Sequence, residues 1–190
     1  MSTAYKLLLF SSLIATFADS LFGPLYAIYV EGIGGDLLDV GNTIALYSVA
    51  TGILIIVAGK VSDRIPKALL TTSGFALAAF GTLAYLVIQT PVQLYALQIV
   101  FAVSTAFLSA PFSALLAKHI NKGEEGFMWA LEGGGGKILF GVGVSIGTFI
   151  THAFGFVAVF LIIFCLQVCA AISQAILFTR SRKTTEVTRQ

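Results

Sequence analysis

Two ionisable residues lie inside long apolar runs of the sequence, where a charge is costly. Asp19 is in the run from Leu7 to Val30, and Lys137 is in the run from Trp129 to Ile150. If these runs cross a membrane, a charge near the middle of a helix costs roughly 2.5–3.5 kcal/mol, so such residues usually serve a function. We predict that Asp19 takes up a proton or contacts a cationic substrate, with Lys137 as its alternating partner. A permanent ion pair that only fixes the packing is the alternative.

The segment EGGGGK, from Glu132 to Lys137, combines a carboxylate with four successive glycines. Each glycine costs a helix about 1 kcal/mol relative to alanine, so we expect a compensating interaction. Close helix packing through Gly134, Gly143 and Gly147 is one explanation, because the last two have GxxxG spacing. A locally unwound segment that lines a cavity is the other. We expect Glu132 near the mouth of such a cavity, as a further candidate for substrate or proton coupling.

Other polar side chains also fall inside apolar runs. Three glutamines are candidates either for lining a cavity or for hydrogen bonds between helices: Gln98, Gln167 and Gln174. Three tyrosines lie toward the ends of their runs, and we assign them to an aromatic belt at the membrane interface: Tyr26, Tyr29 and Tyr47.

The sequence lacks the patterns of several other kinds of chemistry. No Gly-x-Ser-x-Gly or His-Glu-x-x-His pattern occurs, and no glycine-rich loop ends in Lys-Ser or Lys-Thr. His119 and His152 are expected at opposite membrane faces, so we predict no metal site. These observations predict a protein that is not an enzyme, has no cofactor, is not driven by ATP and does not bind nucleic acid.

The elements that would position these residues are membrane helices. The 190 residues are 57% hydrophobic and only 11% charged, which is typical of a protein in a lipid bilayer. At roughly 20 residues per span, the length allows about six spans with short loops. We predict an all-α membrane protein with a six-helix bundle over residues 1–178 and a basic, disordered tail over 179–190. The spans are Leu7–Val30, Asn42–Ala58, Ala68–Ile88, Val92–Ala117, Trp129–Ile150 and Phe154–Phe178.

The basic residues predict how this bundle is oriented. Lys and Arg near the ends of spans stay on the cytoplasmic side. With six spans, all of these fall on the side of the N-terminus: Lys6, Lys60, Arg64, Lys67, Lys118, Lys122, Arg180, Arg182, Lys183 and Arg189. We expect both termini in the cytoplasm of a prokaryotic cell, with the bundle in its inner membrane. The first run begins like a signal peptide, but its length favours a span.

The charged loop GKVSDRIPK, from Gly59 to Lys67, resembles a family signature. In the major facilitator superfamily, the loop between the second and third helices has a glycine, then Asp-Arg four residues later, then a further basic residue. Gly59, Asp63, Arg64 and Lys67 match this pattern, and Pro66 replaces a glycine. The resemblance implies that the aspartate is a cytoplasmic latch between the two halves of a carrier. An ordinary positively charged loop is the alternative.

Further segments resemble the same family. FADSLFGPLYAIYV is similar to its first helix, and YALQIVFAVSTAFLSAPFSALLA is similar to its fourth, with Gln98 where arginine is common. Gly134, Gly143 and Gly147 match part of the antiporter signature of the fifth helix, with Thr148 in the proline position. The resemblance covers one of the family's two six-helix halves. It implies neighbouring first and fifth helices, which would bring Asp19 near Lys137.

Because the resemblance covers only one half of a carrier, it implies that the chain associates with a second half. Two copies inserted the same way up could form a parallel homodimer with the cavity on its twofold axis. Asp63 would then approach residues 126–129 of the second copy. We expect a secondary active transporter of a small solute that works by alternating access and is driven by a proton or substrate gradient. A non-transporting interaction or regulatory protein, and one half of a split carrier, are the alternatives.

Overall fold

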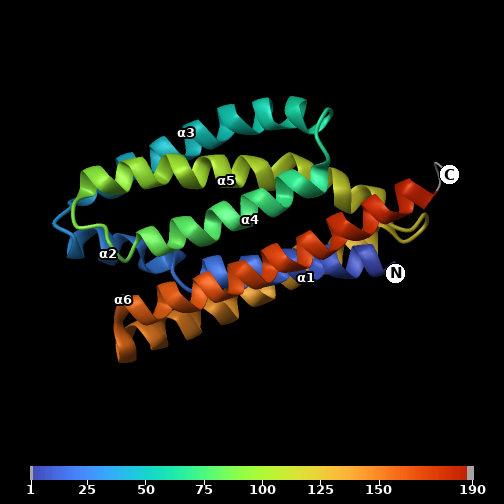
Figure 1. Cartoon of the computed structure of the whole chain (residues 1–190). Helices are drawn as coiled ribbons and strands as arrows, with labels where there is room; N and C mark the ends of the chain where they lie inside the picture. The colour runs from blue at the N-terminus through green and yellow to red at the C-terminus, as the bar shows by residue number, and fades with distance from the viewer. Residues whose placement is uncertain (1, 188–190) are drawn as a thin grey trace.

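The computed structural model describes residues 2–187, and these form helices and no strand. The helices run back and forth along one direction, so that both ends of the chain lie at the same end of the bundle (Figure 1). In chain order the elements are α1 Thr3–Ser20, the short 3₁₀ helix η1 Gly23–Leu25, α2 Tyr26–Gly32, α3 Leu37–Ser62, α4 Lys67–Ala84, α5 Pro91–Lys118 and α6 Glu125–Val187.

The first apolar run is broken just after Asp19. The hydroxyl of Ser2 accepts a hydrogen bond from the backbone N–H of Tyr5 and so caps the start of α1. α1 ends at Ser20, and Pro24 lies in the first turn of η1, where its missing N–H costs least. α2 then completes the apolar stretch Thr3–Gly32. The predicted single span therefore contains a break, and Asp19 lies in the last turn before it.

The next three helices follow the predicted runs closely. Asp36 and Asp39 form a capping box that starts α3 five residues before the predicted Asn42. Pro66 precedes α4, and Pro91 occupies the first turn of α5. α4 ends at Ala84, four residues before the predicted Ile88.

The long helix α6 consists of two helical parts separated at Gly155. This glycine has φ 77° and ψ 176°, which is not helical and is accessible mainly to glycine. The chain reverses direction there, so the two parts lie side by side (Figure 1). When Glu125–Leu177 is counted once, the described residues contain five helices long and apolar enough to cross a membrane. The helix continues to Val187, where a disordered tail was expected from 179 onward; residues 188–190 lie outside the described part.

The bundle is held together by pairs of neighbouring helices. α1 packs against α6, α6 against α4, α4 against α5, and α5 against α3. α1 and α5 barely touch. Large apolar side chains cover the outside of the bundle, as a lipid-facing surface requires; examples are Ile56, Phe80 and Ile138.

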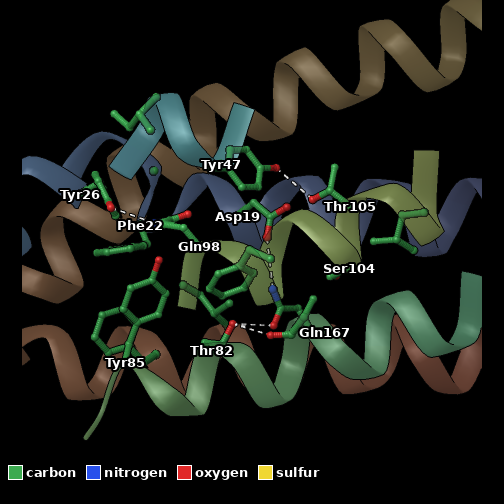
Figure 2. A pocket seen from close by; sticks show the side chains of 17 residues that line it. Asp19, Phe22, Tyr26, Tyr47, Thr82, Tyr85, Gln98, Ser104, Thr105 and Gln167 are labelled. Carbon is green, nitrogen blue, oxygen red and sulfur yellow. Dashed lines mark hydrogen bonds between the residues drawn. The ribbon is translucent and has the colours of Figure 1, made fainter. Parts of the chain in front are cut away.

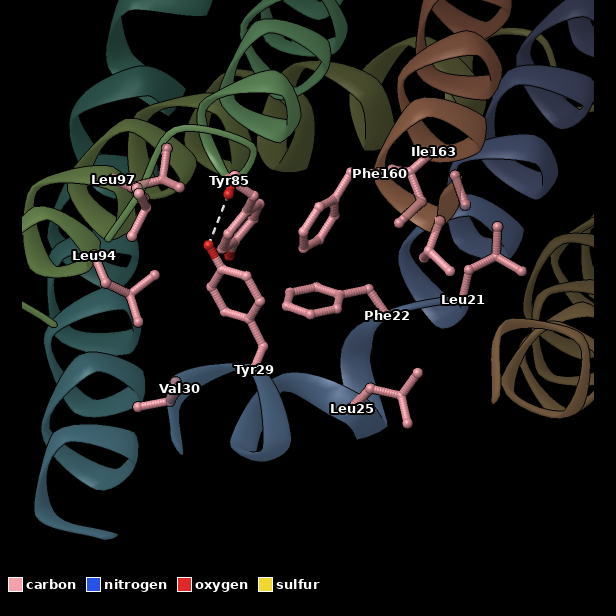
Figure 3. Packing of buried hydrophobic residues seen from close by; sticks show 13 residues of the cluster. Leu21, Phe22, Leu25, Tyr29, Val30, Tyr85, Leu94, Leu97, Phe160 and Ile163 are labelled. Carbon is pink, nitrogen blue, oxygen red and sulfur yellow. Dashed lines mark hydrogen bonds between the residues drawn. The ribbon is translucent and has the colours of Figure 1, made fainter. Parts of the chain in front are cut away.

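Two clusters of buried side chains fill the interior. The larger lies toward the end opposite the termini and is built around aromatic rings (Figure 3). Phe22 contacts Phe160, Tyr85 and Tyr29 edge-on, with ring centroids 4.9, 5.0 and 5.6 Å apart. The smaller cluster surrounds Tyr5 near the end with the termini. Tyr29 was assigned to an interfacial belt; it is instead buried in the core, where its hydroxyl donates to the backbone carbonyl of Tyr85 at 2.7 Å.

Candidate functional site

A cavity of about 380 Å³ lies between the helices, next to the break in the first run. Residues from α1, η1, α2, α3, α4, α5 and α6 line it (Figure 2). Six of them are aromatic: Phe22, Tyr26, Tyr47, Tyr85, Phe101 and Phe160. The polar ones are Asp19, Thr82, Gln98, Ser104, Thr105 and Gln167. Among the described lining residues, Asp19 is the only one that ordinarily carries a charge. The walls therefore combine one carboxylate with many aromatic faces.

The carboxylate of Asp19 is held by an amide from a neighbouring helix. Gln167 on the second part of α6 donates its Nε2 to Asp19 Oδ1 at 3.2 Å. The Oε1 of the same glutamine accepts a hydrogen bond from Thr82 of α4 at 2.8 Å. One side chain thus links α1 to α4, and Figure 2 shows this chain of contacts at the cavity wall. Because the glutamine is anchored at its oxygen, its nitrogen is directed at the carboxylate.

A second set of hydrogen bonds holds other side chains of the cavity wall in place. Gln98 donates its Nε2 to the hydroxyl of Tyr26 at 2.8 Å, and that hydroxyl donates to Thr43 at 2.7 Å. Across the cavity, the hydroxyls of Tyr47 and Thr105 lie 2.9 Å apart and connect α3 to α5. Tyr26 and Tyr47 were assigned to an interfacial belt, and that assignment is wrong because both side chains reach into the bundle (Figure 2).

A smaller cavity, of about 210 Å³, begins on the other side of Asp19. It shares Asp19, Thr105 and Leu108 with the larger one. Its other walls carry two rows of hydroxyl groups, one on α1 and one on α5. They are Ser12 and Thr16 on α1 and Ser109 and Ser113 on α5. The rows follow helical spacing and lead toward the end with the termini. Asp19 consequently lies where an aromatic cavity meets a hydroxyl-lined one.

A second glutamine bridge joins the same helices nearer the end with the termini. Gln174 donates its Nε2 to Ser11 of α1, and its Oε1 accepts from Thr71 of α4 at 3.4 Å. All three side chains are buried. The predicted uses of the two glutamines are both present, because Gln174 connects helices and Gln167 connects helices while also lining the cavity.

Lys137 does not pair with Asp19. The lysine side chain is exposed on α6, and the ion pair found among the described residues joins Lys67 to Asp63. The reason is that Gly135 and Gly136 occupy the face of α6 that packs against α1. A Cβ added at Gly135 would lie 3.2 Å from Leu13, and one added at Gly136 would lie 3.8 Å from Thr16. The residue after Gly136 is rotated by about 100° and points away from α1. The alternative of a permanent ion pair between Asp19 and Lys137 is therefore wrong.

The glycine-rich segment is a regular helix and is not unwound. At Gly143 and Gly147 an added Cβ would collide with Ser20 and with the backbone of Leu21, so these glycines let α6 approach the end of α1. Gly134 has no neighbour within 4 Å and contributes no such contact. Glu132 accepts a hydrogen bond from Ser12 at 2.7 Å, beside the smaller cavity.

The loop between α3 and α4 forms a compact corner. Lys67 Nζ donates to the backbone carbonyl of Ser62 at 2.8 Å and lies 3.7 Å from Asp63 Oδ1. The side chain of Asp63 is 79% exposed. Arg64 and Lys67 line a surface hollow together with Lys118 and His119. A Cβ on Gly59 would lie 3.8 Å from Ala110, an ordinary contact, so close approach does not require this glycine.

The described residues contain no group of three or more His, Cys, Asp or Glu side chains that could hold a metal ion. What the cavity offers is a single carboxylate, an anchored amide and aromatic surface. Such a site can bind and release a solute or a proton.

Comparison with known families gives a match over nearly the whole chain. The sequence model of the Major Facilitator Superfamily matches residues 8–190. A comparison with curated proteins finds no match. Members of this superfamily are membrane transporters and not enzymes, which agrees with several helices apolar enough to cross a membrane. The chain belongs to the major facilitator superfamily.

Proposed function

We propose that the chain is a secondary active transporter in which a small solute binds beside Asp19. The observation that carries the proposal is the position of this carboxylate, on the wall of a cavity between apolar helices with one amide as its hydrogen-bond partner. A carboxylate at a membrane-spanning depth of the bundle needs a proton or a cation to balance its charge. Exchange between the two would couple solute movement to a proton gradient.

Six membrane crossings, with both termini in the cytoplasm, are part of this proposal. The reversal of α6 at Gly155 supports counting its two parts as separate crossings. The loops that carry Lys60 to Lys67 and Lys118 to Lys122 lie at the same end of the bundle as the two termini. The positive-inside rule assigns that end to the cytoplasm.

Alternating access is supported by the two cavities that meet at Asp19. The larger lies toward the end opposite the termini and the smaller toward the termini. A solute or proton on Asp19 could leave by either, depending on which is open. The contact between Tyr47 and Thr105 joins helices on either side of this path, and the break after Ser20 provides a point at which the first run can bend.

A parallel homodimer would explain the open side of the smaller cavity. α1 and α5 are hardly in contact, and Ser113 is exposed between them together with the carboxylate of Asp19. Hydroxyl and carboxylate groups facing lipid would be costly. A second copy in the same orientation would cover this side and place the cavity on a twofold axis.

Transport is tested with purified protein in liposomes that contain a pH-sensitive dye. A panel of sugars, amino acids, organic anions and organic cations is added outside under an imposed pH gradient. We expect one class to change the internal pH in wild-type vesicles and not in Asp19→Asn vesicles. If no class does so in vesicles with folded protein, or if the variant behaves like the wild type, proton-coupled transport through Asp19 is refuted.

Stoichiometry is tested by counting subunits in nanodiscs at several dilutions. Two copies that persist on dilution would support the homodimer. A single copy would favour one half of a split carrier, and a dimer that moves no solute would favour a membrane interaction protein.

A further inference from the structure

The chemistry of the larger cavity goes beyond the presence of a carboxylate. We propose that this cavity binds an organic monocation with a compact, flat hydrophobic body, an inference that rests on the proposed transport function. It assigns the substrate class of the site and makes Asp19 the group that contacts the positive charge.

The charge of the walls is the first support. Asp19 is the only lining residue, among those described, that ordinarily carries a charge, and the lining contains no Lys, Arg or His. Its Oδ1 accepts from Gln167, and the one ion pair among the described residues lies elsewhere, between Lys67 and Asp63. An anionic solute would meet repulsion with no compensating cation. A cationic solute would supply the positive charge that balances Asp19.

The aromatic residues are the second support. Six of the lining side chains are aromatic. Tyr85 stacks with Phe160 at a centroid distance of 4.9 Å and with Phe101 at 5.6 Å, which fixes this part of the wall. Among the described residues, the ring of Tyr47 is in no ring pair, so other rings do not cover its faces. A cation within about 6 Å of such faces is attracted by the ring electrons, and a flat apolar body packs against them. The wall is already assembled without a ligand, which favours binding.

The same walls are poorly suited to a metal cation. Hard cations such as Ca²⁺ take six to eight oxygen ligands. Here the oxygens of Gln167, Tyr26 and Tyr47 are already engaged with other side chains. No group of three metal-ligating side chains occurs among the described residues. A cavity with one carboxylate and six aromatic side chains in its walls suits a cation whose charge is spread over a carbon framework.

Cavity size limits the ligand. A volume of about 380 Å³ is near the lower end of the range for small-molecule sites, roughly 300–1,000 Å³. This size suits a cation of one or two rings. N-methyl-4-phenylpyridinium is a suitable probe, and 4-phenylpyridine, which is largely uncharged at neutral pH, is its matched neutral control.

The test is equilibrium binding of both probes to the full chain in nanodiscs. We expect the wild type to bind the cation at least about tenfold more tightly than the neutral probe, as a charge-assisted contact implies. Asp19→Asn should abolish this preference, and Asp19→Glu should restore part of it. Glu31→Gln removes a carboxylate from exposed α2, outside the cavity, and should leave cation binding unchanged.

Removal of one ring tests the aromatic contribution without changing the charge. Tyr47→Leu should weaken cation binding by about three- to tenfold, within the range of a cation–π contact. Circular dichroism of each variant shows whether it is folded. Equal binding of both probes, no binding of the cation by folded wild type, or tight binding by folded Asp19→Asn would each overturn the inference.

The outcomes also separate this inference from the proposed function. If the liposome panel shows Asp19-dependent movement of a neutral or anionic solute while the cationic probe does not bind, the substrate class is wrong and proton-coupled transport stands. If the cation binds in an Asp19-dependent manner and nothing is transported, the site is right and the transport proposal fails.

Discussion

Gln174 and Gln167 make the same connection at two levels of the bundle. Each links α1 to α4 by donating its amide nitrogen to α1 and accepting from a threonine of α4. At the first level the α1 partner is Ser11, and every member is buried. At the second level the partner is Asp19, which faces two cavities.

The two bridges differ as a packing contact would differ from the proposed binding site. The bridge through Gln174 consists of neutral groups that satisfy one another, as expected for hydrogen bonds that only hold helices together. The bridge through Gln167 ends on a carboxylate that lines both cavities. A charge would not be needed for packing at that position, because a serine does the same at the other level.

Asp19→Asn gives the sharpest separation of the two bridges. Asparagine keeps the shape and a hydrogen-bond acceptor for Gln167 but removes the charge. We expect solute-driven proton uptake to fall by about 10- to 100-fold, from a charge-assisted contact worth about 1.5–3 kcal/mol. Uptake by dye-loaded liposomes measures the loss. Ser11→Ala at the other bridge should leave uptake within about twofold of wild type, by the modest value of such bonds in membranes.

Gly147→Ala tests whether packing fixes the position of Asp19. The added Cβ would collide with the backbone of Leu21, two residues from Asp19. We expect a loss of about 1–3 kcal/mol in unfolding free energy, as for overpacked interiors. Gly134→Ala is the matched control, because its Cβ meets nothing and a helix gains up to about 1 kcal/mol from alanine. Both are measured by circular dichroism during denaturation in micelles.

An equal response to the two alanines would contradict this account of the interface. It would mean that α6 can shift along α1 without cost. The position of Asp19 would then not depend on the close approach at Gly147.

Substitution of each glutamine by leucine distinguishes the two bridges, because one variant should lose stability and the other should change the pH dependence of transport. Gln174→Leu should lower the unfolding free energy by about 0.5–2 kcal/mol and leave the apparent affinity for solute unchanged. Gln167→Leu removes the partner of the carboxylate, so its main effect should be a shifted pH dependence of transport. If Gln174→Leu shifts the pH profile as much as Gln167→Leu, the two bridges are not functionally different.

The helical character and much of the site were predictable from hydrophobic patterning. Runs of apolar residues located the helices within a few residues, and the isolated carboxylate of Asp19 drew attention to a residue that lies on a cavity wall. The family signature at Gly59 to Lys67 was also readable, since its spacing lies within one loop.

What the sequence did not predict depends on the rotation of each helix. Whether Lys137 faces α1 is decided by one residue step, because each step turns a helix by about 100°. Tyr26 and Tyr47 are typical residues of an interfacial belt. Tyr26 is turned inward by its contacts with α3 and α5, and Tyr47 by the packing of α3 against α5. The link from Gln167 to Asp19 spans 148 positions, which no local pattern encodes.

The charge at the end of α3 contrasts with Asp19 and carries the smallest expected effect. Asp63 is 79% exposed and lies 3.7 Å from Lys67, a surface pair worth at most about 1 kcal/mol. Asp63→Asn should therefore leave the unfolding free energy nearly unchanged. If Asp63 latches onto the start of α6 in a second copy, the dimer should dissociate about two- to fivefold more readily, as subunit counting on dilution would reveal. Unchanged association together with unchanged transport would mean that this loop only anchors the bundle at the membrane surface.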